Sequence, residues 1–349
     1  MPLVAAMASS HSPIIFQDTY EGWMRWFRLI SSEIPQPRDV LLQDEARVTE
    51  WIKRRRRAFG RLATAIESHA PRALIVVGGD QNEWFSSANN PNIMVYAGED
   101  DIVGFHNYGD FDTEPLANFW EHEDRFGVRL EVHTELAEHF LSELVRRDFD
   151  ISISRSQNPQ GRPELKAPHA LTRPTPLLMA KLRVPIIPII IKTTERTSAA
   201  LSGERCIELG RAIGNICSGL DEPIAIYGSG GMSHDPSGPL SGWVDEVLDN
   251  WVLDCLKTNN FDELGSLFSF RSAATDSGTG ELRTWLVAAA AMSAAQPAAG
   301  CQVIDYFPAH IATVGAGWVL WEAEADSAAE DQSVNPPRRS DHRISRAAV

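Results

Sequence analysis

Residues 73–80, ALIVVGGD, set five apolar residues in a row and end them with two glycines and an aspartate. A short apolar run that stops at glycine is typical of a strand buried on both faces of a sheet. Similar runs occur at residues 3–8 (LVAAMA), 184–192 (VPIIPIIIK) and 222–230 (EPIAIYGSG). Strands of this kind indicate a sheet that is covered by helices on both sides.

Helical segments separate these strands. In residues 45–69 the apolar side chains recur at helical spacing. Further helices are expected over 133–147, 199–217, 242–256 and 281–293, and closing strands over 303–307 and 311–321. We therefore predict an α/β fold: a single domain over residues 1–321, with a central mixed or largely parallel sheet flanked by helices. Residues 322–349 are small, charged and proline-containing, and are predicted to form a disordered polar tail.

The composition narrows the class of protein. The 349 residues carry a formal net charge of -15, which argues against a nucleic acid or an anionic membrane as partner. The four cysteines form no CxxC pair, which argues against a disulfide framework or a structural zinc site and favours a reducing, cytoplasmic setting. No basic segment precedes the N-terminal apolar run, and no uncharged apolar stretch reaches the ~18 residues of a membrane span. We expect neither a signal peptide nor a membrane segment.

Polar side chains follow the buried strands. In an open α/β sheet, ligands bind beyond the carboxyl ends of the strands. His11 follows the first strand, Asp80 and Gln81 follow the second, and His234 lies in the loop after the fourth. Two histidines brought to one sheet edge from distant segments indicate a constructed site, although each alone could be an ordinary loop residue.

Two more residues and a glycine-rich loop are candidates for the same site. Glu281 opens an apolar helix, where a carboxylate either complements the helix dipole or binds a ligand. His169, in KAPHALTRPTP, is either a site residue or a surface loop residue. The glycines of YGSGGMSHD (227–235) are expected to allow unusual backbone angles and close approach to a ligand. Two histidines and one carboxylate suit a non-heme Fe(II) site with open positions for substrate and O₂. A further histidine could then move protons.

The chain resembles the class III (LigB-type) extradiol ring-cleaving dioxygenases from about residue 5 to about residue 321. The segments that carry the resemblance are SSHSP (9–13), IVVGGDQNEWF (75–85), APHALTRPTPLL (167–178), YGSGGMSHD (227–235), GTGELRTW (278–285) and AAGCQVIDYFPAH (298–310). The GSGGMSH loop is the most specific of them.

This resemblance implies a catalytic domain with its active site at the carboxyl ends of the strands. It also implies Fe(II), with Mn(II) as another possible metal, and extradiol cleavage of a catechol-like substrate of the protocatechuate, gallate, methylgallate or aminophenol type. By the same resemblance, His11 and Glu281 bind iron, His234 is the acid–base residue and His169 lines the substrate pocket.

Gln81 departs from the family pattern. The second iron-binding histidine of the family follows an aspartate at the end of the second strand, and here Gln81 follows Asp80. A glutamine amide oxygen is a weaker ligand for Fe(II) than imidazole. Three alternatives follow. Gln81 or Asp80 completes the metal coordination, or His106 supplies the third ligand instead. Otherwise the chain is a non-catalytic or altered-chemistry homologue or subunit. Because the other site residues match the pattern, we favour a working enzyme with Gln81 as third ligand.

The resemblance leaves the substrate contacts and partners as expectations. Arg173 and Thr175 are expected to recognise a substrate carboxylate, with a surface arginine as the alternative, and Asp80 to contact substrate. The expected partners are a small aromatic substrate and O₂, a second copy of the chain and a small separate helical subunit, with no nucleic acid or membrane. A metal-dependent hydrolase or lyase that works without O₂ is the rival class of enzyme.

Overall fold

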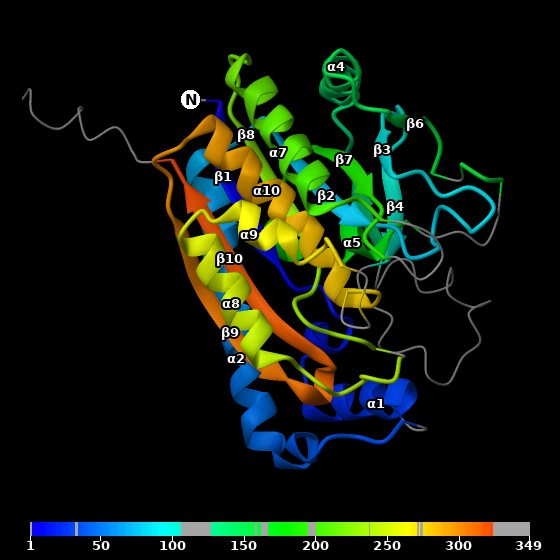
Figure 1. Ribbon diagram of the computed structural model, residues 1–349, viewed down its shortest axis with the longest axis vertical. Helices are drawn as coiled ribbons and strands as arrows, with labels where there is room; N and C mark the ends of the chain where they lie inside the picture. The colour runs from blue at the N-terminus through cyan, green and yellow to red at the C-terminus, as the bar shows by residue number, and fades with distance from the viewer. Residues whose placement is uncertain are drawn as a thin grey trace, which may run out of the picture.

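A computed structural model describes residues 2–31, 34–105, 127–157, 159–161, 167–194, 200–236, 238–270, 272 and 275–323. Its centre is an eight-stranded sheet in the order β6-β3-β7-β2-β8-β1-β10-β9 (Figure 1). The strands of this sheet are β1 (Leu3–Ser9), β2 (Ala73–Gly79), β3 (Ile93–Tyr96), β6 (Ser152–Ser154), β7 (Ile186–Ile191), β8 (Ile224–Ser229), β9 (Cys301–Ala309) and β10 (Val314–Glu322). A separate antiparallel pair joins β4 (Ile102–Phe105) to β5 (Gly127–Leu130).

The four strands at the middle of the sheet, β7, β2, β8 and β1, run parallel to one another. Antiparallel pairing begins at β3 on one side and at β10 on the other. The parallel strands therefore direct their carboxyl ends to one edge, where the segments after β1, β2, β7 and β8 meet. The α/β fold with a mixed, mostly parallel sheet is confirmed.

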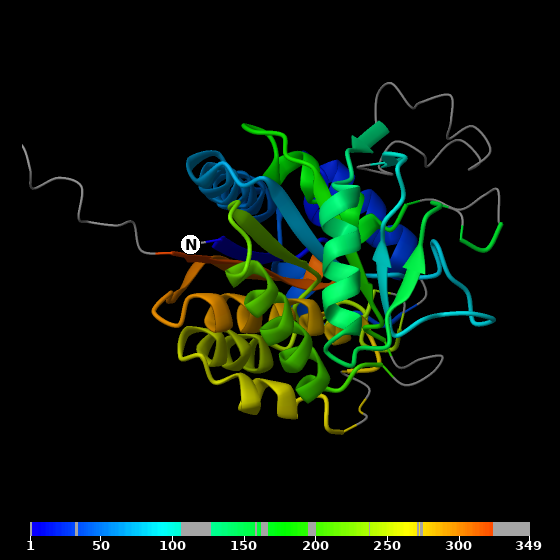
Figure 2. The same ribbon diagram turned by 90° about the horizontal axis from the view of Figure 1, so that it is seen from above.

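Helices cover both faces of this sheet. The helices are α1 (Tyr20–Ser31), α2 (Glu45–His69), α4 (Thr134–Val145), α5 (His169–Thr172), α6 (Thr175–Leu178), α7 (Gly203–Ser218), α8 (Glu246–Lys257), α9 (Phe261–Ser266) and α10 (Leu282–Ala295). Short 3₁₀ turns are η1 (Ile14–Phe16), η2 (Arg38–Leu42), η4 (Gly278–Glu281) and η5 (His310–Ala312). Figure 2 shows α2 on one side of the sheet and α7, α8 and α10 on the other. Among the described residues, none of the helices is both long and apolar enough to cross a membrane.

Alternate side chains of each central strand enter two separate cores. In β1, Ala6 and Ala8 pack toward α7 and α10, whereas Ala5 and Met7 pack toward α1 and α2. Such two-sided burial explains why these strands are continuous apolar runs without polar alternation. The five helices expected at 45–69, 133–147, 199–217, 242–256 and 281–293 are present as α2, α4, α7, α8 and α10. Helix α1 was not predicted from the sequence.

Helix α10 lies in the centre of one layer, between the sheet and α7. Every residue from Leu282 to Met292 is buried, as expected for a helix that is apolar on all sides apart from Arg283 and Thr284. Glycines permit this packing: a Cβ at Gly210 of α7 would come within 2.7 Å of Ala290 Cβ and would also overlap the Val287 carbonyl. A Cβ at Gly228 of β8 would come within 2.5 Å of the Thr284 carbonyl oxygen. Small residues therefore set the distance between α10 and its neighbours.

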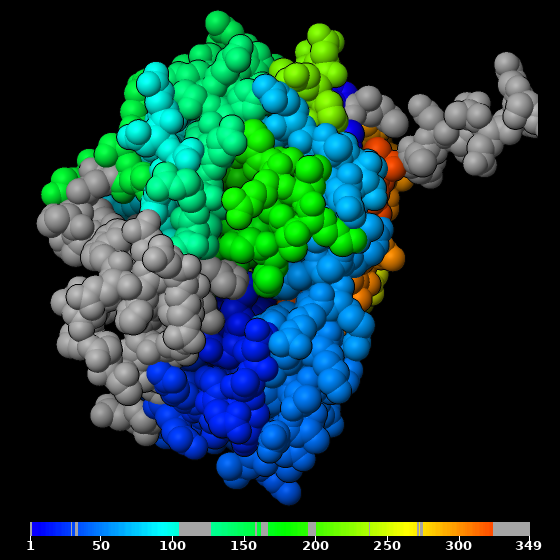
Figure 3. All heavy atoms as spheres, turned by 180° about the vertical axis from the view of Figure 1, so that it is seen from behind, coloured from blue at the N-terminus to red at the C-terminus, as the bar shows by residue number. Residues whose placement is uncertain are grey.

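The segment that contains α5 and α6 packs on the opposite face. Figure 3 shows this green segment beside the blue α2, and Lys181 Nζ donates to Thr64 Oγ1 of α2 at 2.9 Å. Helix α5 also approaches β2 closely, because a Cβ at Gly78 would lie only 2.6 Å from Ala170 Cβ. A glycine in β2 thus lets the turn that carries His169 reach the sheet edge.

We predict opposite effects for two glycine-to-alanine substitutions in helices. Gly210→Ala should lower the free energy of unfolding by about 1–3 kcal/mol, because its Cβ would press α7 away from α10. Gly60→Ala in α2 should raise it by up to about 1 kcal/mol, because nothing lies within 4 Å of the added Cβ. Urea unfolding of both variants measures the difference, and equal effects of the two would contradict this account of α10 packing.

Candidate metal centre

His11 follows β1 and presents one ring nitrogen to the interior of the site. Its Nδ1 lies 2.9 Å from Ser229 Oγ, and that hydroxyl donates its own proton to the Ala170 carbonyl at 2.6 Å. Ser229 can therefore only accept from His11, so the proton of the neutral ring is on Nδ1. The lone pair on Nε2 then faces Glu281 Oε2 at 3.1 Å.

Glu281 ends η4 immediately before α10 and is 2% exposed. Its Oε2 accepts from the backbone N–H of Gly231 at 2.8 Å, and its Oε1 accepts from the side-chain amide of Gln81. Burial raises the pKa of the Glu281 carboxyl, but a positive charge held at the His11 ring, and after it one at His234, lowers that pKa to well below its ordinary value. Glu281 is therefore an ionised carboxylate in the protein interior.

His169 is the first residue of α5, and its ring stands edge-on to that of His11 at 4.7 Å between centroids. Its backbone N–H and its ring Nδ1 both approach the same oxygen, Glu83 Oε1, at 2.9 and 2.6 Å. Burial, and after it the charge of Arg173, keeps the pKa of His169 well below its ordinary value, so the ring is neutral. With the Nδ1 proton directed at Glu83, the lone pair of His169 is on Nε2.

His234 follows the glycine-rich loop after β8. Its Nδ1 donates to the Met232 carbonyl at 2.8 Å, and its Nε2 lies 3.5 Å from Glu281 Oε2. A Cβ at Gly231 or at Gly278 would overlap the His234 ring. The loop glycines thus make room for this ring. The expected unusual backbone angles at 228, 230 and 231 are wrong, because the positive φ angles among the described glycines belong to Gly161 and Gly242.

These side chains form an arrangement that fits a divalent cation. One ligand atom each from His11, His169 and Glu281 lie within 4.8 Å of one another, and all three residues are buried. His11 Nε2 has no hydrogen-bond partner, and its lone pair opposes a carboxylate oxygen. Two acceptors at 3.1 Å repel each other unless a proton or a cation lies between them. Two imidazoles and one carboxylate are the ligand set of non-heme Fe(II) sites with open positions.

Gln81 contacts Glu281, but it does so through its amide nitrogen. Because a carboxylate only accepts, the atom that faces Glu281 must be the NH₂ group of Gln81. Asp80 Oδ1 and Oδ2 accept from the backbone N–H groups of Trp84 and Phe85 at 2.8 and 3.2 Å. Burial raises the pKa of Asp80 to about 6. Asp80 thus holds the turn after β2, and that turn presents Gln81 to the site.

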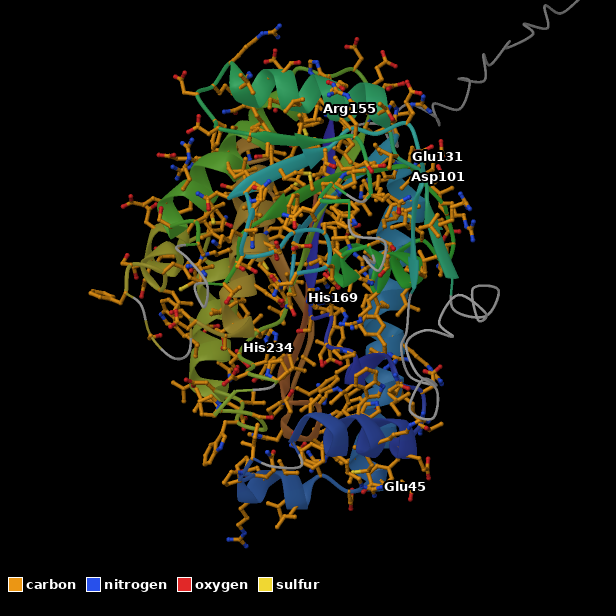
Figure 4. All side chains as sticks on the ribbon, turned by 90° about the vertical axis from the view of Figure 1, so that its right-hand side faces the viewer. Glu45, Asp101, Glu131, Arg155, His169 and His234 are labelled. Atoms are coloured by element: carbon orange, nitrogen blue, oxygen red, sulfur yellow. The ribbon has the colours of Figure 1, made fainter. Side chains whose placement is uncertain are left out.

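Two cavities adjoin these residues. A cavity of about 250 Å³, which we call the metal-side cavity, is lined by Asp80, Gln81, Thr193, His234, Glu281 and neighbouring residues. A larger one of about 480 Å³, the side cavity, shares His234 and Ser277 with it. Figure 4 labels His169 and His234, which both lie in the middle of the molecule in that view.

Two residues expected to recognise substrate lie away from these cavities. Arg173 is 7% exposed and its Nη1 donates to the His11 carbonyl at 3.4 Å. Thr175 is fully buried and its hydroxyl donates to the Leu171 carbonyl at 2.7 Å. Neither residue lines either cavity. His106, considered as a metal ligand, lies outside the described residues.

Sequence reasoning gave no role to three polar residues that position the site. Glu83 holds His169. The sequence feature that could have indicated Glu83 is its position two residues after Gln81. Ser229 ends β8 in register with the end of β1, which brings it to His11. Asp249 of α8 is fully buried and accepts from the backbone N–H and hydroxyl of Ser233, next to His234, at 2.7 and 2.9 Å.

Comparisons with known proteins give a family match and several distant relatives. The family model described as the catalytic LigB subunit of aromatic ring-opening dioxygenase matches residues 30–315. A 2,3-dihydroxyphenylpropionate/2,3-dihydroxicinnamic acid 1,2-dioxygenase of Photorhabdus laumondii is 27% identical over 199 residues, which are 57% of this chain and 54% of that protein. A Rhodococcus globerulus protein of the same name is 25% identical over 190 residues, 52% of this chain and 56% of that protein.

The chain spans about half the length of these curated relatives. Among solved structures, an uncharacterized protein from Escherichia coli K12 matches with a TM-score of 0.48 and 12% identity, over 91% of this chain and 99% of that one.

Asp249 gives a pH-dependent prediction. Burial raises the pKa of its carboxyl to about 6, although hydrogen bonds from Ser233 and Tyr306 lower it in part. The folded protein therefore binds this proton more tightly than the unfolded chain does. The resulting stability is fully present below about pH 4 and is lost as the pH rises through about 6.

In Asp249→Asn this contribution disappears. From pH 4 to pH 7 the free energy of unfolding of the variant should therefore fall by about 1–3 kcal/mol less than that of the wild type. Urea unfolding at the two pH values measures this difference. Parallel pH dependences of the two proteins would show that the Asp249 proton does not affect stability.

Proposed function

Because this chain belongs to the LigB family of aromatic ring-opening dioxygenases, we propose that it binds Fe(II) and cleaves a catechol-like ring with O₂ in an extradiol reaction. The observation that carries the proposal is the convergence of the His11, His169 and Glu281 ligand atoms within 4.8 Å. The relatives named as 1,2-dioxygenases of dihydroxylated aromatic acids support the same class of reaction.

In this proposal His11, His169 and Glu281 hold the metal, and Gln81 does not. His169 takes the third ligand position because its Nε2 lone pair is directed away from Glu83, as that of His11 is directed away from Ser229. A carboxylate behind a ligand histidine fixes the orientation of its ring and increases its basicity. A bound ferrous ion would supply Lewis acidity to the two substrate oxygens and electron transfer to O₂.

Gln81 has a different role in this site. Its NH₂ group donates to Glu281 Oε1, while Oε2 accepts from Gly231 N–H. These two donors fix the rotation of the carboxylate and leave Oε2 directed at His11. Gln81 is thus a positioning residue for Glu281, and its side chain forms part of the wall of the metal-side cavity.

His234 is the residue that would move protons. Its Nδ1–H is bonded to the Met232 carbonyl, so Nε2 is the atom that accepts a proton from a substrate hydroxyl in the adjoining cavity. The same carbonyl stabilises the protonated ring, because Nδ1 still donates to it. Histidine suits this exchange near neutral pH. Ser277 Oγ donates to the His234 carbonyl at 2.7 Å and Thr279 Oγ1 accepts from its backbone N–H at 3.1 Å, which keeps the ring in place.

We expect protein loaded anaerobically with Fe(II) to consume O₂ only when a catechol is added. With ¹⁸O₂, both labelled atoms should appear in a ring-opened product. His234→Ala should keep the wild-type iron content and lose about 10²–10⁴-fold in kcat. His139→Ala, on the exposed side of α4, is the matched control and should leave both values unchanged.

Substrate turnover without O₂ uptake would replace this proposal with a hydrolase or lyase. Equal loss of iron and activity in His234→Ala would instead make His234 a metal ligand.

A further inference from the structure

The side cavity lies directly beyond the residue that we assign to proton transfer. Its volume of about 480 Å³ is within the range of small-molecule sites. His234 and Ser277 line both this cavity and the metal-side cavity. A ring held at the metal next to His234 would therefore lie beside the side cavity.

Apolar side chains form much of the wall of this cavity. They come from the loop after β8 and the start of α8, and are Leu240, Trp243, Val244, Val247 and Leu248. Leu240, Trp243 and Val247 are 39%, 53% and 83% exposed. Large apolar side chains that remain exposed beside a cavity indicate a surface that binds an apolar group of a ligand.

The charged side chains at the same wall are acidic. The cavity is lined by Asp39, Asp235, Asp245 and Glu246, and by no lysine or arginine among the residues that the structure describes. The second histidine, His310, donates from Nδ1 to the Gly242 carbonyl at 2.8 Å, and its Nε2 faces Glu246 at 3.7 Å. An anionic substituent would meet these carboxylates without a described cationic side chain to bind it, and Arg173 lies outside the cavity.

We propose that the side cavity receives a bulky, apolar ring substituent of the substrate that carries no acid group. The inference rests on the proposed function, since it assumes that a catechol ring is bound at the metal. It separates this chain from its named relatives, whose substrates bear a propionate or acrylate acid chain. Trp243 and Val247 are the residues that select the substituent, by contact with its apolar surface.

The test compares catechol with phenyl-substituted and propionate-substituted catechols, each as the 3- and the 4-isomer. The protein is loaded anaerobically with Fe(II). For the better isomer of each pair, kcat/KM should be roughly tenfold or more higher for phenylcatechol than for the propionate, because the phenyl group buries apolar area and the acid meets like charges. A higher kcat/KM for the propionate would overturn the inference.

Two variants locate the effect. In Trp243→Ala the ratio of kcat/KM for phenylcatechol to that for catechol should fall about tenfold, and Trp243→Phe should recover most of the ratio. Val145→Ala, an exposed apolar residue at the end of α4, is the control and should leave the ratio unchanged. An unchanged ratio in Trp243→Ala would overturn the inference.

Anaerobic calorimetry separates this inference from the proposed function. If the loaded protein binds the catechols but consumes no O₂, the proposed function fails. The dissociation constants then test the inference, which predicts that phenylcatechol binds more tightly than the propionate-substituted catechol. Weaker binding of phenylcatechol than of the propionate would contradict it.

Discussion

The ionised carboxylate of Glu281 is the buried charge around which the site is arranged. It is 2% exposed, and it faces His11, His234, the Gly231 N–H and the Gln81 amide. A carboxylate in the protein interior is stable only when donors or positive charge compensate its desolvation. The two neutral donors satisfy part of this need, but the lone pair of a neutral His11 ring, 3.1 Å from Oε2, works against it. A divalent cation between the carboxylate and the imidazoles would resolve the conflict.

The sequence predicted the scaffold of this arrangement well, because the relevant signals are local. Uninterrupted apolar runs identify strands that are buried on both faces, and in ALIVVGGD the apolar run and the two glycines after it form β2. Helical periodicity located α2, whose bounds Glu45–His69 coincide with the predicted segment. Parallel strands then bring His11 and His234 to one edge of the sheet, which the alternation of strands and helices was enough to predict.

The place of His169 could not be predicted from local pattern. It depends on the packing of α5 against β2, where Gly78 leaves room for Ala170, and on Glu83, which contacts both the backbone and the ring of His169. The orientation of Gln81 likewise depends on Glu281, a residue two hundred positions away. Sequence reasoning considered Gln81 as a ligand because of its position after Asp80. Hydrogen bonding to an acceptor instead favours a supporting role.

Metal affinity in matched variants tests this account most directly. Metal-free wild type, His169→Ala, Gln81→Ala and His139→Ala are titrated with Fe(II) under anaerobic conditions, and calorimetry gives stoichiometry and Kd. The account predicts one metal per chain in the wild type and a loss of affinity of at least about 100-fold in His169→Ala. It predicts that Gln81→Ala lowers the affinity for Fe(II) about tenfold, as expected for a residue that supports a ligand. His139→Ala should leave the affinity unchanged. A larger loss in Gln81→Ala than in His169→Ala would contradict the assignment of the third ligand.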